Sequence, residues 1–177
     1  MGCASSRSPF DNKTMQKLIN EYIEETKLDQ VTCNFIKRLD IQCRGDLIDR
    51  SSYEMLAKNW HLKANFSLFT KTNFISKSDL KLSLLVFSKD SDESKVALLK
   101  EIASTNNRLA MRYPELAYQL VYQRIPEELA RMKKISEAEK VAYINKKRLS
   151  AGTSACLFFS NYMENPENLK TINIDIN

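Results

Sequence analysis

Apolar residues recur at helical spacing in the first part of this chain, and that spacing limits the fold more than any other feature. Over 13–28 they stand at positions i, i+3, i+4, i+7 and i+8, which line one face of an α-helix. These residues are Met15, Leu18, Ile19, Tyr22 and Ile23. Asp11 or Asn12 can serve as the N-cap. Only three of the 177 residues are glycine, which is typical of an ordered, helix-rich protein.

The same spacing continues after Asp29 and predicts a second helix, which we expect Gly45 to terminate. Its apolar residues are Val31, Phe35, Ile36 and Leu39. A third, short helix is expected from Ser52 to Trp60. Between 62 and 88 the pattern is mixed. Leu80, Leu82, Leu84 and Val86 alternate as in a strand, whereas Leu84, Leu85 and Phe87 also fit a buried helix, so both interpretations stay open.

Helix-start signals continue through the second half of the chain. Asp90 with Glu93, and Ser136 with Glu139, have the spacing of capping boxes. Pro114 and Pro126 are each expected in a first helical turn, where proline is tolerated. The helix after Ser136 is expected to end at Gly152 and to bury four apolar residues, which are Val141, Ala142, Ile144 and Leu149.

The fold class predicted from these signals is mainly α, a compact bundle of about six to eight helices. A small β element is expected around 62–88, where the pattern is mixed, or around 153–176. In the latter range Thr153–Met163 reads as a final buried helix or strand, and the tail alternates apolar and polar residues. We expect a flexible leader at 1–10, one helical domain at 11–165 and a tail at 166–177. Apolar runs are far shorter than the roughly 20 residues of a membrane-spanning helix, and no secretory signal is visible.

The first residues, MGCASSRS, carry the clearest functional signal. Gly2 follows the initiator methionine and Ser6 is the small hydroxyl residue of the N-myristoylation pattern, with the basic residue Arg7 next to it. A single myristoyl chain binds membranes only marginally, so stable anchoring needs a second signal. The thiol of Cys3 provides one, because S-palmitoylation there would add a second chain. The sequence therefore predicts dual acylation of Gly2 and Cys3.

This leader resembles the dual-acylation leaders of Src-family kinases, plant membrane-tethered kinases and plant-pathogen effectors. The resemblance covers residues 1–8 alone and implies acylation of Gly2 and Cys3, with localisation on the cytoplasmic face of a membrane, most simply the plasma membrane. It implies nothing about the body, which carries no kinase glycine-rich loop or catalytic loop.

Positive charge is concentrated near the end of the expected domain. The chain has a formal net charge of +5, and residues 124–148 contain eight Lys or Arg against four Glu. The candidate contacts to anionic lipid are Arg131, Lys133, Lys134, Lys146, Lys147 and Arg148. The alternative is that they are solvated helix faces, with local pairs such as Glu127 with Arg131. No nucleic-acid recognition motif accompanies the charge, so no nucleic-acid partner is expected.

Catalytic and metal motifs are weak by comparison. Residues 90–101 place Asp90, Asp92 and Glu101 at positions 1, 3 and 12 of a calcium loop, but position 6 is Lys95 where glycine is needed, so helix capping is the favoured interpretation. Four cysteines without a CxxC pair and one histidine predict neither a zinc site nor a disulfide framework. We expect no metal and no cofactor.

The leading hypothesis is a non-enzymatic, acylated peripheral membrane protein that acts as an adaptor, scaffold or matrix-like protein and binds an unknown protein partner. The alternative is a membrane-delivered effector enzyme, a thiol-dependent protease or acyltransferase. That enzyme would need His61 as base, oriented by Asp49 or Asp79, and a nucleophile among the cysteines Cys33, Cys43 and Cys156. A third possibility is an acyl switch, in which the bundle hides the myristoyl chain until a partner releases it.

Overall fold

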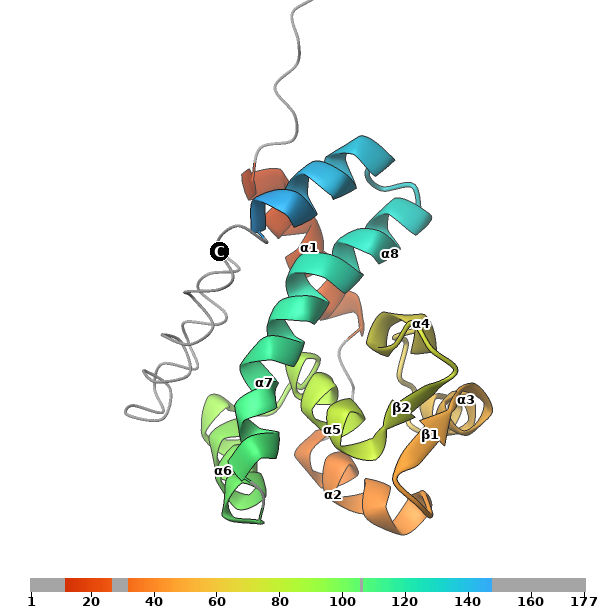
Figure 1. Ribbon diagram of the computed structural model, residues 1–177, viewed down its shortest axis with the longest axis vertical. Coiled ribbons are helices and arrows are strands. Elements are labelled where there is room, and N and C mark those ends of the chain that lie inside the picture. The colour runs from red at the N-terminus through yellow and green to blue at the C-terminus, as the bar shows by residue number, and fades with distance from the viewer. Residues whose placement is uncertain (1–11, 27–31, 106, 148–177) are drawn as a thin grey trace, which may run out of the picture.

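A computed structural model of the chain describes residues 12–26, 32–105 and 107–147, and within these ranges the protein is mainly α, as predicted (Figure 1). The α-helices are α1 (Asn12–Thr26), α2 (Thr32–Gln42), α3 (Arg50–Asn59), α4 (Phe66–Phe69), α5 (Lys77–Val86), α6 (Asp92–Thr105), α7 (Asn107–Gln119) and α8 (Ile125–Arg131). A π-helical segment, η1 (Leu120–Arg124), joins α7 to α8, and a further helix covers 137–147. The leader, the tail and the possible element at 153–176 lie outside the described residues.

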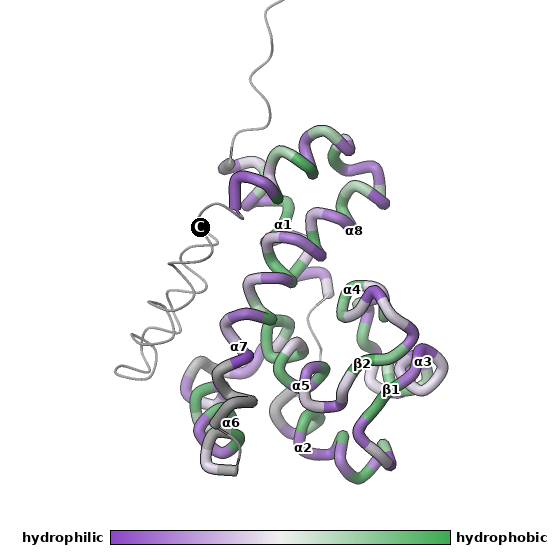
Figure 2. Tube along the Cα trace, viewed as in Figure 1, coloured by the Kyte–Doolittle hydropathy of each residue, from purple (hydrophilic) through white to green (hydrophobic). Residues whose placement is uncertain are grey.

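The helix α5 lies at the centre of the bundle and packs against both α2 and α7. Leu82, Leu84 and Leu85 are each fully buried. A helix surrounded on all sides needs no polar face, so its sequence loses the 3.6-residue period. This is why the periodicity of 80–87 could not distinguish a helix from a strand. Most other helices alternate hydrophobic and hydrophilic residues along the chain, as Figure 2 shows.

Two three-residue strands form a small antiparallel sheet, β1 (Leu47–Asp49) with β2 (Phe74–Ser76). Ile48 lies opposite Ile75, and both side chains are buried, whereas Leu47 and Phe74 are 64% and 53% exposed. A β element does lie within 62–88, at 74–76, but the alternating residues 80–86 that suggested it belong to α5, and the partner strand at 47–49 was not predicted. Three residues carry too little sequence pattern, and such short strands are stable only when helices pack against them.

Each strand leads directly into a capped helix. The carboxylate of Asp49 accepts a hydrogen bond from the backbone N–H of Ser52 at 2.7 Å, and the hydroxyl of Ser76 accepts one from the N–H of Asp79 at 3.1 Å. Gly45 lies in the turn before β1 with φ +90°, three residues after α2 ends at Gln42. The fold thus contains two helix–strand–helix units, α2–β1–α3 and α4–β2–α5, joined through the strands.

Two of the expected helix starts are wrong in detail. Because α6 begins at Asp92, its N-cap is Ser91 rather than Asp90, and Ser91 Oγ accepts from the N–H of Ser94 at 3.3 Å. The backbone N–H of Asp90 donates to Ser88 Oγ. Pro114 lies inside α7 rather than in a first turn. Because proline lacks an N–H, one intrahelical hydrogen bond is lost there. Pro126 does lie at the start of α8, as predicted.

The capping box at Ser136 and Glu139 is confirmed. The N–H of Ser136 donates to Glu139 Oε2 at 2.7 Å, and the N–H of Glu139 donates to Ser136 Oγ at 3.1 Å. The expected apolar face of this helix is partly wrong, because Val141 and Ala142 are exposed and the buried residue is Tyr143. The tyrosine ring packs near Tyr122 on η1, which turns the helix away from the expected face. Leu149 and Gly152 lie outside the described residues.

Candidate lipid-facing surface

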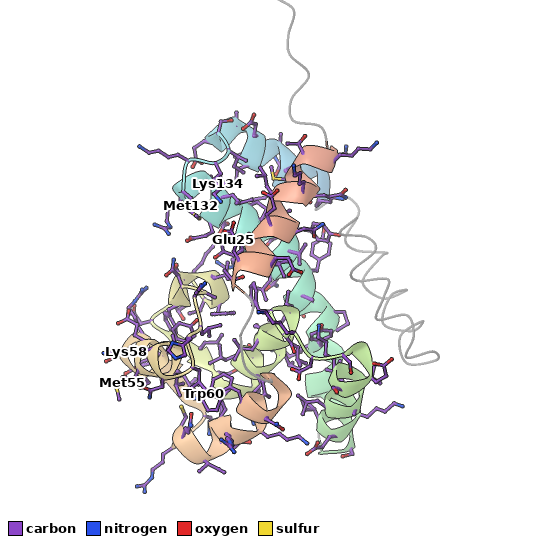
Figure 3. All side chains as sticks on the ribbon, turned by 180° about the vertical axis from the view of Figure 1, so that it is seen from behind. Glu25, Met55, Lys58, Trp60, Met132 and Lys134 are labelled. Atoms are coloured by element: carbon purple, nitrogen blue, oxygen red, sulfur yellow. The ribbon has the colours of Figure 1, made fainter. Side chains whose placement is uncertain are left out.

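One end of the molecule brings together the attachment point of the leader and several exposed cations. Residues 12 and 147, where the described chain begins and ends, lie toward the same end of its long axis (Figure 1). Figure 3 places Met132 and Lys134 at this end as well. The predicted acylation residues Gly2, Cys3, Ser6 and Arg7 lie outside the described residues, but the chain that carries them joins the body here.

The loop after α8 and the outward side of the 137–147 helix form this surface. Lys133, Lys134 and Lys146 are exposed, and Lys133 has φ +58° in the turn that ends α8. Two of the large apolar side chains exposed in the described structure lie among them, Met132 at 42% and Val141 at 50%. We call these five residues the leader-end surface. Its mixture of cations and apolar side chains is the composition of surfaces that lie on membranes.

Glutamates at this end are held by neighbouring groups. Glu137 forms an ion pair with Lys140, and Glu139 accepts the hydrogen bond that caps the 137–147 helix. Both carboxylates are therefore engaged locally, although the side chain of Glu137 is 75% exposed.

Arg131 is exposed but is also tied to α8. Its guanidinium donates from Nε to Glu128 Oε2 at 2.9 Å and from Nη2 to Glu128 Oε1 at 2.5 Å. The partner of Arg131 is therefore Glu128 and not Glu127, the residue that the sequence suggested. Glu128 is 6% exposed and also accepts from Asn65 Nδ2 at 3.0 Å. The hydrogen bonds from Arg131 lower the pKa of Glu128. Arg131 therefore bridges a buried carboxylate and the surface.

Lys147 is likewise engaged within the molecule. Its ammonium lies over two tyrosine rings, 5.0 Å from the centroid of Tyr122 and 5.7 Å from that of Tyr143. The hydroxyl of Tyr118 donates to the Lys147 carbonyl, which fastens the end of the helix to α7. Of the six basic residues selected from the sequence, Lys133, Lys134 and Lys146 are exposed, Arg131 and Lys147 make intramolecular contacts, and Arg148 lies outside the described residues.

A second charged cluster lies where the two helix–strand–helix units meet. The ammonium of Lys77, whose side chain is only 13% exposed, donates to the Cys43 carbonyl at 2.7 Å and lies 3.7 Å from Asp40 Oδ1. Lys81 contacts Asp40 Oδ2 at 2.5 Å, and the N–H of Lys77 donates to the Asp46 carbonyl at 2.7 Å. Two cations of α5 thus satisfy the carboxyl end of α2, where the helix dipole also favours positive charge.

This arrangement bears on calcium, because a helix–loop–helix unit is also the plan of an EF-hand. Residues 92–101 of the candidate loop belong to α6, with Val96 and Leu98 buried, and the helix is capped at Ser91 instead of the predicted Asp90. Before β1, lysine ammonium groups contact the Asp40 carboxylate of α2 and the Cys43 carbonyl. No group of three or more His, Cys, Asp or Glu that could hold a metal occurs among the described residues.

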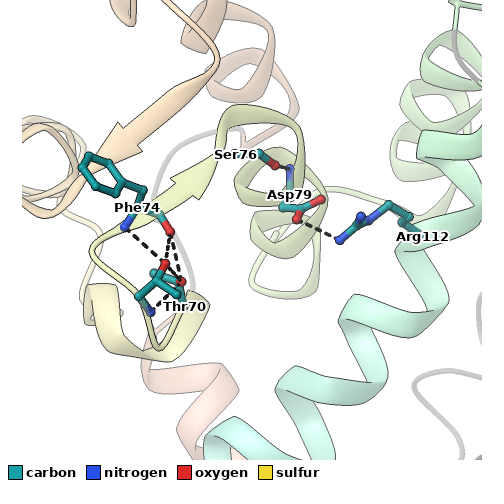
Figure 4. A network of polar contacts seen from close by, with 6 residues as sticks. Thr70, Phe74, Ser76, Asp79 and Arg112 are labelled. Carbon is teal, nitrogen blue, oxygen red and sulfur yellow. Dashed lines mark hydrogen bonds and ion pairs between the residues drawn. The ribbon is translucent and has the colours of Figure 1, made fainter.

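The turn before β2 is closed by hydroxyl groups (Figure 4). The hydroxyls of Thr70 and Thr72 lie 3.0 Å apart and donate to the Phe74 carbonyl at 3.1 and 2.7 Å. Further along the chain, Asp79 pairs with Arg112 of α7 at 2.9 Å. The Phe74 carbonyl and both threonine hydroxyls of this turn therefore accept hydrogen bonds from protein donors.

The thiol and imidazole considered for catalysis lie in ordinary surroundings where the structure describes them. Cys43 is half-buried, and burial raises the pKa of its thiol, although the nearby Lys77 acts in the opposite direction. A raised pKa reduces the thiolate fraction, which is the opposite of an activated nucleophile. His61 is exposed in the turn after α3, with φ +53°. The side chain of Cys33 and all of Cys156 lie outside the described part.

Comparison of the chain with protein-family models, curated proteins and solved structures finds no match. In the described residues, no helix combines the length and the apolar character needed to span a bilayer.

Proposed function

We propose that this chain is a peripheral membrane protein anchored through acyl groups on Gly2 and Cys3 and acting as a non-enzymatic adaptor. The carrying observation is the MGCASSRS leader, which joins the body at the end that bears the leader-end surface. Two acyl chains supply stable anchoring where one would not. The exposed lysines Lys133 and Lys134 at that end of the molecule would add attraction to anionic lipid, worth roughly 1 kcal/mol for each residue near the bilayer.

The adaptor role is supported by apolar side chains exposed on elements away from the leader end. These are Ile41 on α2, Leu47 on β1, Met55 on α3 and Phe74 on β2, each more than half exposed. Exposed apolar surface rimmed by polar residues is typical of contact with other macromolecules. With the lipid at one end, this surface would face away from the membrane.

Replacing single lysines of the leader-end surface tests how it contributes. Lys133→Gln, Lys134→Gln and Lys146→Gln are each expected to weaken binding of the acylated protein to phosphatidylserine-containing vesicles about fivefold, because each removes roughly 1 kcal/mol of attraction. Vesicle co-sedimentation at low and physiological salt measures the effect, which should shrink as salt rises.

Lys100→Gln is the matched control, because Lys100 is an exposed lysine on α6 outside the leader-end surface. It is expected to bind like the wild type. Equal weakening by Lys100→Gln would mean that only net charge matters and that the surface has no defined orientation toward the membrane.

A further inference from the structure

A cationic pocket opens on the flank of the molecule between α3, the 62–65 loop, α4 and α8. Its volume is 380 Å³, within the usual range for small-molecule sites. Arg50 of α3, Lys63 of the loop and Arg131 of α8 all line it, and Glu54 is the carboxylate among its lining residues. Three cations from separate elements therefore surround one concave surface.

The walls of the pocket are held in place by hydrogen bonds across those elements. The N–H of Leu62 donates to the Ala57 carbonyl at 2.8 Å, and the buried hydroxyl of Tyr53 donates to the Ala64 carbonyl. Asn65 donates to Glu128 on α8 at 3.0 Å. The loop that carries Lys63 is thus fastened to both α3 and α8, so the pocket is preformed, which reduces the entropic cost of binding a ligand.

Two of the cations are also positioned from behind. The guanidinium of Arg50 lies 5.2 Å from the centroid of the Phe66 ring, and that of Arg131 is fixed by two hydrogen bonds to the buried Glu128. A guanidinium has five N–H donors, so Arg131 retains donors beyond the two that Glu128 accepts. Glu128 balances the charge of Arg131, and Glu54 opposes one of the other two cations. The pocket therefore keeps an excess positive charge.

We propose that this pocket binds a small polyphosphorylated polar group of the size of an inositol phosphate, either free or as the headgroup of a lipid. Arginine side chains fix phosphate oxygens through paired N–H donors, and Lys63 adds a point charge. Arg131 directly precedes Met132 of the leader-end surface, so a lipid headgroup is one source of the ligand. Only that source depends on the membrane function proposed above.

Calorimetric titration of the full-length Gly2→Ala chain with inositol trisphosphate tests the pocket without an acyl anchor. We expect one binding site, and the double variant Arg50→Gln/Lys63→Gln should weaken binding about tenfold or more, since charge-assisted hydrogen bonds to phosphate are lost. Lys58→Gln is the control, because this exposed lysine of α3, labelled in Figure 3, is not among the residues that line the pocket. Thermal melting verifies that the variants remain folded. Absence of binding, or equal weakening by Lys58→Gln, would overturn the proposal.

Vesicles then identify the source of the phosphate. Phosphatidylcholine vesicles that contain phosphatidylinositol bisphosphate are compared with vesicles of equal charge that contain phosphatidylserine. Stronger binding of the Gly2→Ala chain to the former, lost in the double variant, supports a lipid headgroup. Binding of inositol trisphosphate without such a preference supports a free ligand. The Gly2→Ala chain carries no myristoyl group in either the calorimetric or the vesicle experiment. A negative result in these experiments therefore does not bear on the anchoring proposal, and a negative result on anchoring does not bear on binding to this pocket.

Discussion

Leu84→Ala is expected to lower the free energy of unfolding by about 3–5 kcal/mol, because it removes buried methyl groups and leaves a cavity in the centre of the bundle. Leu84 is fully buried on α5, between helices that cannot close the gap without moving their own packed side chains. Urea unfolding followed by the fluorescence of Trp60 measures the loss. This single tryptophan packs against Phe35, with ring centroids 4.5 Å apart, so it reports on the same core.

Ile41→Ala provides the comparison for this prediction. Ile41 is 82% exposed at the end of α2, so the same kind of truncation should change stability by less than about 0.5 kcal/mol. A similar loss in both variants would contradict the central position of α5.

Lys77→Met should lower the free energy of unfolding by about 2 kcal/mol, because the Cys43 carbonyl loses a charged donor and Asp40 loses a neighbouring cation. Methionine keeps most of the apolar stem of the side chain, so the change isolates the ammonium group. The same urea titration measures it. Lys37→Met is the control, since Lys37 is 54% exposed and its pair with Glu101 is an ordinary surface ion pair.

The Asp40 cluster also makes stability depend on acid pH. The hydrogen bond from Lys81 is the largest influence that lowers the pKa of Asp40 below its usual value. A carboxyl group with a lowered pKa in the folded state stabilises the fold above its unfolded pKa and loses that contribution as the pH falls through the lowered value. The acid sensitivity of unfolding should therefore be smaller in Asp40→Asn, and an unchanged pH profile would show that the contact has no energetic effect.

Local signals predicted the helical parts of this fold well. The spacing from Met15 to Ile23 identified α1, whose residues Met15, Ile19, Tyr22 and Ile23 are buried. The Ser136 and Glu139 box was also found, because both of its hydrogen bonds join residues three positions apart. Where the determining contact is short in sequence, the residues alone suffice.

Features that depend on distant contacts were missed. β1 exists because Ile48 meets Ile75 across the fold, and the orientation of the 137–147 helix is set by Tyr143 packing near Tyr122. The pocket lined by Arg50, Lys63 and Arg131 unites segments that nothing in the linear sequence connects. The basic cluster was recognised by its composition, but composition does not reveal that Arg131 and Lys147 are held by Glu128 and by tyrosine rings.

Acylation of Gly2 and Cys3 is the basis of the proposed function. It is tested most directly by cell fractionation of the wild type, Gly2→Ala and Cys3→Ser, with intact-mass analysis of the purified wild type. The wild type should be found in the membrane fraction with the added mass of one myristoyl and one palmitoyl group. Gly2→Ala should be released to the soluble fraction, and Cys3→Ser should bind membranes weakly, because one chain gives only marginal affinity. Identical distribution of all three proteins and a wild-type mass without acyl groups would contradict the proposal.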